Sequence, residues 1–258
     1  MLTFAPHLLA RNPHFQTVIS TRMPPVKAEM LASAQEALLS LAVDGSVKLQ
    51  GFYSSQVNSK GVVLLLHGWL GSAESTYMLA VGEALFQEGY SVFRLNMRDH
   101  GGTARLNQGV FHGCRLGEVF QSARQVANLE AGKSFFIVGF SMGGNFALRL
   151  AWQHSQSPIV TLQHVVSVNP SVNTRQTIIE IDRSPLYRYY FLRKWHKHLL
   201  EKEAAFPNVY DFSALKNINT SYELGEATIA AYTGFPDSDS YYLLNKSGGS
   251  CIQEGWSN

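Results

Sequence analysis

The sequence predicts an α/β protein built on a mostly parallel sheet with helices on both faces. Two observations predict it: apolar runs of strand length at 62–66 and 135–138, and segments of helical spacing that alternate with them. A continuous apolar run is typical of a parallel strand that helices bury on both faces. Of the 258 residues, 45% are hydrophobic and 16% charged, which provides for a sizeable core and excludes an intrinsically disordered chain.

The first regular element is expected to be an antiparallel hairpin over residues 36–53. Leu39, Leu41 and Val43 alternate with their neighbours, and Asp44-Gly45 is a turn signal. Strands and helices then alternate along the chain. We expect strands at 61–67, 91–95, 134–140 and 161–168, and helices at 75–88, 115–130 and 143–154.

The pattern changes near residue 175, where basic side chains begin to mix with aromatic ones. Arg188, Lys194 and Lys202 are interspersed with Tyr190 and Trp195, which predicts one or two amphipathic helices after the last strand. We therefore expect three parts. They are an α/β core over residues 1–174, a helical cap over 175–242 and an irregular tail over 243–258.

Charge and cysteine content argue against several classes of protein. Lys and Arg number 21 and Asp and Glu 19, and the net charge of +2 is smaller than is usual for a protein that binds nucleic acid by neutralising phosphates. Two cysteines cannot form a disulfide framework, and no Cys/His pair has zinc-site spacing. We find neither a secretory signal nor a membrane-spanning run, and expect a cytoplasmic protein without a metal or organic cofactor.

The motif that carries chemistry is Gly139-Phe140-Ser141-Met142-Gly143, which matches G-x-S-x-G. An apolar strand segment leads into it and an Ala- and Leu-rich helical segment follows, which is the setting of a nucleophile elbow. Such a turn strains the serine backbone and exposes its hydroxyl, while Gly139 and Gly143 let helix and strand approach. Ser141 is therefore the candidate nucleophile; the alternative is a glycine-rich turn with an idle serine.

A second loop supplies candidate oxyanion donors. His67-Gly68-Trp69 follows the first buried strand and is expected to face the elbow. We expect the backbone N–H groups of Met142 and Trp69 to stabilise an oxyanion. His67 is also a candidate base, although a histidine that fixes the loop by hydrogen bonds is the better interpretation.

A third polar group, Arg98, Asp99 and His100, follows the next strand. Ligands bind at the carboxyl ends of strands in open α/β sheets, so this position suits a site. The interpretation we favour is structural: salt bridges and hydrogen bonds from these side chains hold neighbouring loops together.

These motifs, together with two further segments, resemble a known family. The matching segments are NPHFQT at 12–17, HGWLGS at 67–72, NMRDHGG at 96–102, GFSMGG at 139–144, and GFPD at 234–237 followed by Tyr241-Tyr242. They resemble the α/β-hydrolase superfamily, in particular its YheT-like (AB hydrolase 4) esterase branch. The resemblance implies the α/β-hydrolase fold, a helical cap and hydrolysis of carboxylic esters, with short-chain esters or acylglycerol-like lipids as substrates.

The family places its catalytic Asp and His on loops after two further strands, in the order Ser, Asp, His. This chain has neither a strand-like run nor a histidine after residue 242. We therefore expect the last strands and the catalytic histidine to be missing, as in a C-terminally truncated hydrolase. The strand at 161–168 would then form an edge of the sheet.

The remaining acids and histidines differ in whether they could take the place of a triad member. The downstream acids Asp182, Asp211, Asp237 and Asp239 follow no recognisable strand, and we expect them to be solvated or to cap helices. The histidines that could substitute for the base are His100, His112, His196 and His198.

The sequence thus favours a serine hydrolase that acts on carboxylic esters. Because a serine without a base is a poor nucleophile, a catalytically impaired hydrolase scaffold is one alternative. Another is binding of a membrane surface or a partner through the basic, aromatic segment 187–202. For that segment the simpler interpretation is a cap helix that covers an acyl pocket and exposes its basic face.

Overall fold

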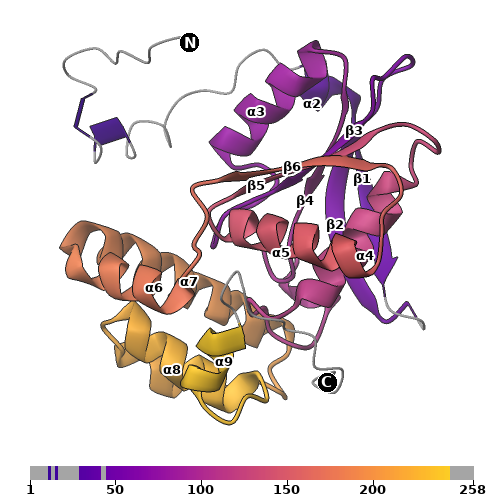
Figure 1. Cartoon of the computed structure of the whole chain (residues 1–258). Helices are drawn as coiled ribbons and strands as arrows, with labels where there is room; N and C mark the ends of the chain where they lie inside the picture. Colours follow the sequence, from indigo (N-terminus) through magenta and orange to yellow (C-terminus); the bar gives the residue numbers. More distant parts are fainter. Residues whose placement is uncertain (1–10, 13–14, 17–28, 42–44, 245–258) are drawn as a thin grey trace.

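A six-stranded sheet with the order β1-β2-β4-β3-β5-β6 forms the centre of the computed structural model (Figure 1). The structure describes residues 11–12, 15–16, 29–41 and 45–244. The first two strands form the predicted antiparallel hairpin, and the other four run parallel to one another, which confirms the predicted mostly parallel sheet. The strands are β1 (Ala34–Leu41), β2 (Val47–Ser54), β3 (Val62–Leu66), β4 (Ser91–Leu95), β5 (Phe135–Phe140) and β6 (Leu162–Val168).

Helices cover both faces of this sheet, as the buried strands require. In β3, Leu64 and Leu66 pack on one face, whereas Val63 and Leu65 pack on the other with Met30. The side chains on both faces of β3 are therefore buried from solvent, which explains its unbroken apolar sequence. One face carries α2 (Glu29–Ser33) and α3 (Thr76–Gln87), and the opposite face carries α4 (Leu116–Ala127) and α5 (Met142–Gln156).

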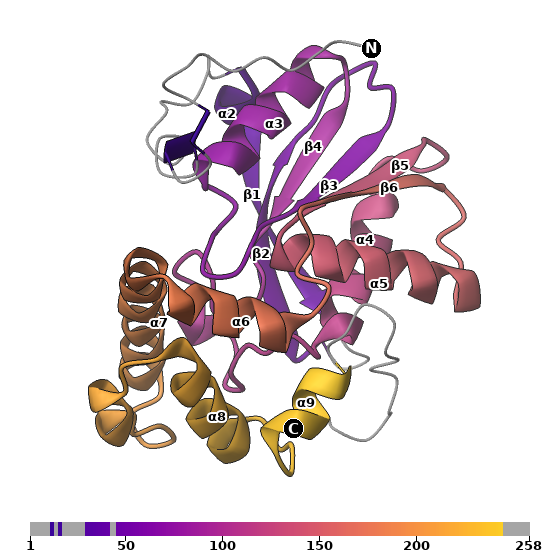
Figure 2. The same cartoon turned by 60° about the vertical axis from the view of Figure 1, so that its left-hand side comes forward.

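A layer of helices follows β6 and lies beyond the carboxyl ends of the parallel strands (Figures 1 and 2). One or two helices were expected here, and the described residues contain four α-helices. The additional ones are hard to find from periodicity because α8 carries Gly225 and Thr228 among its apolar residues. The layer consists of α6 (Thr174–Arg183), α7 (Pro185–Ala205), a short 3-10 turn η3 (Ser213–Asn217), α8 (Ser221–Tyr232) and α9 (Ser238–Leu244). A second 3-10 turn, η2 (Ala104–Leu106), lies in the loop after β4 and contacts α7.

The basic residues of α7 do not all lie on its outer side, which corrects the expectation that the cap exposes its basic face. Arg193 and Lys197 are exposed. Lys194 and Lys202 instead line a cavity between α7 and the sheet, and the Lys202 side chain is only 2% exposed. The inner side of α7 is therefore partly charged.

Within the described residues, β6 pairs only with β5 and so forms the expected edge of the sheet. Val166 on this strand is 50% exposed. Val43 and Asp44 of the predicted turn, residues 13–14 and 17 of segment 12–17, and the tail from residue 245 lie outside the described residues. In the part of the chain that is described, no helix combines the length and apolar character needed to cross a membrane.

Candidate active site

Ser141 lies at the turn between β5 and α5. Its φ of 52° and ψ of −112° are strained for a residue with a side chain. Gly139 and Gly143 make the turn possible, because a Cβ on Gly139 would overlap the carbonyl group of Gly143 and one on Gly143 would overlap the carbonyl group of Leu66. The Ser141 side chain remains exposed. The turn therefore has the geometry expected of a nucleophile elbow.

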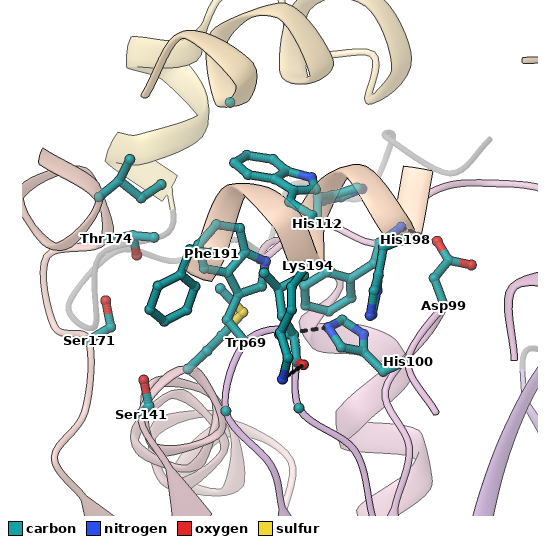
Figure 3. A pocket seen from close by; sticks show the side chains of 18 of the residues that line it. Trp69, Asp99, His100, His112, Ser141, Ser171, Thr174, Phe191, Lys194 and His198 are labelled. Atoms are coloured by element: carbon teal, nitrogen blue, oxygen red, sulfur yellow. Dashed lines mark hydrogen bonds between the residues drawn. The ribbon is translucent and has the colours of Figure 1, made fainter. Parts of the chain in front are cut away.

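Ser141 faces a cavity of about 620 Å³ between the carboxyl edge of the sheet and the helical layer (Figure 3). Aromatic side chains dominate one wall. Trp69 stacks on Phe191 with ring centroids 5.4 Å apart and meets Trp195 edge-on at 4.8 Å. A cavity of this size and largely apolar lining is typical of a site for a small organic molecule.

The backbone N–H groups of the loop after β3 differ in their hydrogen bonding. The N–H of Gly68 donates to the Tyr77 hydroxyl at 2.8 Å, and the N–H of Leu70 donates to His100 Nε2 at 3.2 Å. The N–H of Trp69, between them, has no acceptor among the described residues. Of these three N–H groups, only that of Trp69 is available to a ligand, and Trp69 is the residue predicted from the sequence as an oxyanion donor.

The second expected donor, the N–H of Met142, is the first of α5. The first N–H groups of a helix have no acceptor within the helix, and the described residues supply none for Met142. The loop lies next to the elbow, because a Cβ built on Gly68 would lie 3.2 Å from Ser141 Cβ. Ser141 therefore adjoins both the loop and the start of α5, where an oxyanion would need its donors.

His67 is completely buried, and both of its ring nitrogens are occupied. Nδ1 donates to the Gly68 carbonyl at 2.7 Å, and Nε2 accepts from the N–H of Met97 at 3.1 Å. Burial lowers the pKa of His67 to about 4, so the ring is neutral at physiological pH. This arrangement agrees with the interpretation that His67 fixes the loop.

His100 is held in the same way. Its Nδ1 donates to the Arg98 carbonyl at 2.7 Å and its Nε2 accepts from Leu70, while burial keeps its pKa well below the usual value. With both nitrogens occupied, neither His67 nor His100 has a ring nitrogen left for the Ser141 hydroxyl.

Arg98 and Asp99 hold loops together, in agreement with the structural interpretation. The Arg98 guanidinium donates to both carboxylate oxygens of Glu118, at 2.5 and 3.1 Å. Asp99 accepts from the N–H of Phe111 at 2.7 Å and from Lys202 Nζ at 2.8 Å. The ion pair with Lys202 fastens α7 to the loop after β4.

Two of the other histidines line the cavity, and none is bonded to the serine. His112 has a buried Nδ1 without a hydrogen-bond partner in the described residues, and burial lowers its pKa. His198 lies across the cavity from Ser141, with its ring 5.1 Å from that of His100 (Figure 3). His196 is not among the residues that line the cavity. In the described part of the chain, the histidines and carboxylates have other partners or none, and none of them hydrogen-bonds to the Ser141 hydroxyl.

The four downstream acids are capping or exposed residues, as expected. Asp182 accepts from the N–H groups of Ser221 and Tyr222, both at 2.8 Å, at the start of α8. Asp211 and Asp237 accept from backbone N–H groups two and three residues further along. Asp239 pairs with Arg175 at the surface. The structure thus gives each of them a partner away from Ser141.

Sequence reasoning did not find Tyr77 and missed the place of Lys194. The Tyr77 hydroxyl holds Gly68 in place, and Lys194 Nζ donates to the carbonyl of Leu70 at 3.2 Å. Both side chains lie on helices, Tyr77 on α3 and Lys194 on α7, and no local sequence pattern marks either of them. Only the tertiary packing shows that both contact the loop after β3.

Comparisons with known proteins agree with the fold. Residues 61–212, more than half of the chain, match the family model for the alpha/beta hydrolase fold. The esterase Pf2001 of Pyrococcus furiosus superposes with a TM-score of 0.50 and 22% identity, over 64% of each chain. A second structure of that esterase gives a TM-score of 0.49 and 21% identity, over 68% of this chain and 65% of its own.

Est1E of Butyrivibrio proteoclasticus, in a structure with bound ferulic acid, gives a TM-score of 0.43 and 21% identity over 56% of each chain. No curated protein sequence matches significantly. The chain spans about 65% of the length of Pf2001, and at these identities the likeness is one of fold. On the family model and the sheet topology, this chain belongs to the α/β-hydrolase fold family.

Proposed function

We propose that this chain is a serine hydrolase of carboxylic esters with Ser141 as its nucleophile. The observation that supports the proposal is the strained backbone of Ser141, with φ of 52°, at a turn that exposes its side chain to the cavity. Such strain persists only where the surrounding structure imposes it, and it is found preferentially at functional sites. The two open N–H groups beside this serine are the second support.

In the proposed reaction, Ser141 Oγ attacks the ester carbonyl carbon while its proton passes to water or to a base. The carbonyl oxygen becomes an oxyanion that accepts hydrogen bonds from the N–H groups of Met142 and Trp69. Collapse of this intermediate breaks the bond to the alcohol, which leaves with a proton. The acyl-enzyme that remains is then hydrolysed by water to a carboxylic acid.

We propose a carboxylesterase or acylglycerol lipase type of activity, on short-chain esters or acylglycerol-like lipids, and a place in the YheT-like branch. The largely apolar cavity and its aromatic wall of Trp69, Phe191 and Trp195 support an acyl or aromatic group as its occupant. The resemblance of the motifs supports the branch.

We further propose that turnover is slow. A triad enzyme that has lost a member keeps roughly 10³–10⁴-fold catalysis over water through its oxyanion hole and substrate binding. Because no described histidine reaches Ser141, hydrolysis of the acyl-enzyme would lack a base as well. An activated ester should therefore leave an acyl group on Ser141 that persists long enough to be observed by mass spectrometry of the intact protein.

A fluorophosphonate probe tests the role of Ser141. We expect the folded protein to be labelled at Ser141 and Ser141→Ala to abolish labelling. Ser155→Ala is the matched control, because Ser155 lies on the same helix at an exposed position far from the turn, and it should leave labelling unchanged. Absence of labelling in the folded protein would contradict the proposal and favour a catalytically impaired scaffold.

A further inference from the structure

We propose that the cavity selects esters that also carry a carboxylate group, and that Lys194 binds this carboxylate. The inference rests on the proposed function, because it names a substrate class for the same cavity. Figure 3 shows Lys194 among the side chains that line the cavity with Ser141.

The charges of the cavity lining do not balance. Its charged side chains are Asp99, Lys202 and Lys194. Asp99 and Lys202 form a buried ion pair with Nζ and Oδ1 2.8 Å apart. Among the described residues, no carboxylate lies within ion-pair distance of Lys194, so the cavity carries one uncompensated positive charge.

The hydrogen-bonding capacity of Lys194 is also incompletely used. An ammonium group has three N–H donors. The described residues offer it one acceptor, the Leu70 carbonyl at 3.2 Å, and the Tyr190 ring, whose centroid is 4.9 Å from Nζ. A cation in largely apolar surroundings is costly unless it is paired, so a carboxylate that enters the cavity gains both charge compensation and hydrogen bonds.

The position of Lys194 defines the rest of the ligand. Its partner Leu70 follows the proposed donor Trp69, so the ammonium lies beside the oxyanion loop. The surrounding wall is aromatic, which suits an aliphatic or aromatic spacer between ester and carboxylate. Among the described residues that line the cavity, Lys194 is the one lysine without an ion-pair partner, and there is no arginine. This favours a monoanionic carboxylate over a phosphate dianion, which needs more donors.

Binding to the Ser141→Ala protein tests this without any hydrolysis. The probes are monomethyl suberate, which carries one carboxylate, and its neutral counterpart dimethyl suberate. Binding is followed by the fluorescence of Trp69 and Trp195 in the cavity wall. We expect the monoanion to bind about ten-fold more tightly than the neutral diester. This ratio corresponds to the free energy that one charge-assisted hydrogen bond contributes to binding.

Lys194→Met in the same background should remove this preference and leave dimethyl suberate binding unchanged. Lys197→Met is the matched control, since Lys197 lies on the same helix with its side chain 74% exposed and paired to Glu201, and it should keep the preference. If Lys194→Met no longer binds the diester, Lys194→Gln takes its place, and Lys194→Arg should retain the preference.

Equal affinities for the two probes in Ser141→Ala, or a preference that survives loss of the Lys194 charge, would overturn the inference. The outcome is separate from that of the proposed function, because fluorophosphonate labelling reports on Ser141 and probe binding reports on Lys194.

Discussion

The two walls of the cavity are built in different ways. On the sheet side, neutral and buried histidines, His67 and His100, connect loops through backbone hydrogen bonds at 2.7–3.2 Å. On the helical side, Lys194 and Lys202 of α7 reach loops more than 90 residues away in the sequence. The two histidines of the first wall make these contacts without charge, whereas the contacts of the second wall are made by ammonium groups.

This difference indicates a division of roles. The sheet wall fixes Ser141 and the two open N–H groups, which must not move during a reaction. The helical wall supplies about half of the residues that line the cavity, and its attachment includes the buried ion pair of Lys202 with Asp99. Substitutions in the sheet wall should therefore affect stability and labelling together, whereas substitutions confined to the helical wall can affect stability but should leave labelling unchanged.

The largest effect is expected from Gly143→Ala in the sheet wall. A Cβ at this position would overlap the backbone carbonyl groups of Leu66 and His67, so α5 has to move away from β3. We expect the free energy of unfolding to fall by about 4 kcal/mol or more, measured by urea denaturation, and labelling of Ser141 to be lost.

Gly117→Ala in α4 is the matched control for this prediction. No atom of the described residues lies within 4 Å of a Cβ built on Gly117, which is exposed in a helix. Alanine should stabilise the protein there by up to about 1 kcal/mol. Similar costs for the two substitutions would show that the elbow is not tightly packed.

The next effect concerns the junction of the two walls. Lys202 Nζ donates to Asp99 and also lies within hydrogen-bond distance of the carbonyls of Ala104, Asn107 and Gly109. Lys202→Met leaves the Asp99 carboxylate buried without its partner, and we expect a loss of about 3 kcal/mol in the free energy of unfolding.

A double-mutant cycle with Asp99→Asn sharpens this prediction. Once Lys202 is gone, Asp99→Asn removes an unpaired charge, so the double variant should lose less stability than the sum of the two single variants. The exposed Lys197→Met should change stability by less than about 0.5 kcal/mol. Additive losses would mean that the ion pair does not couple α7 to the loop after β4.

The sheet wall was predictable from the sequence because its causes are local. An apolar run, a glycine-flanked serine and a helical segment are adjacent in the chain, and together they predicted the strained turn at Ser141. The role of His67 followed likewise from its place directly after β3. Even the edge position of β6 was expected, since no further strand-like run was found after it.

The helical wall was harder to predict because its contacts are distant in sequence. The partners Lys202 and Asp99 are 103 residues apart, and Asp182 caps a helix that begins 39 residues later. A basic residue in a helix is usually solvated, and no local pattern marks Lys194 as facing a cavity. Hence the prediction that the cap helix exposes its basic face was only partly correct.

The smallest effect is expected from Asp182→Ala, which lies wholly within the helical wall. Its carboxylate accepts from the first two N–H groups of α8, both at 2.8 Å, and joins α6 to α8. Loss of such a cap costs about 1 kcal/mol, which should lower the thermal midpoint by about 2–4 °C. Asp239→Ala, at a side chain 74% exposed, is the control and should leave the midpoint unchanged.

The informative measurement for Asp182→Ala is labelling at Ser141. The sheet wall is held by its own hydrogen bonds, so the rate of fluorophosphonate labelling at a temperature well below the midpoint should equal that of the unmodified protein. A slower rate at that temperature would mean that the helical layer positions Ser141 or the loop after β3. The two walls would then form a single unit, and the division of roles between them would be wrong.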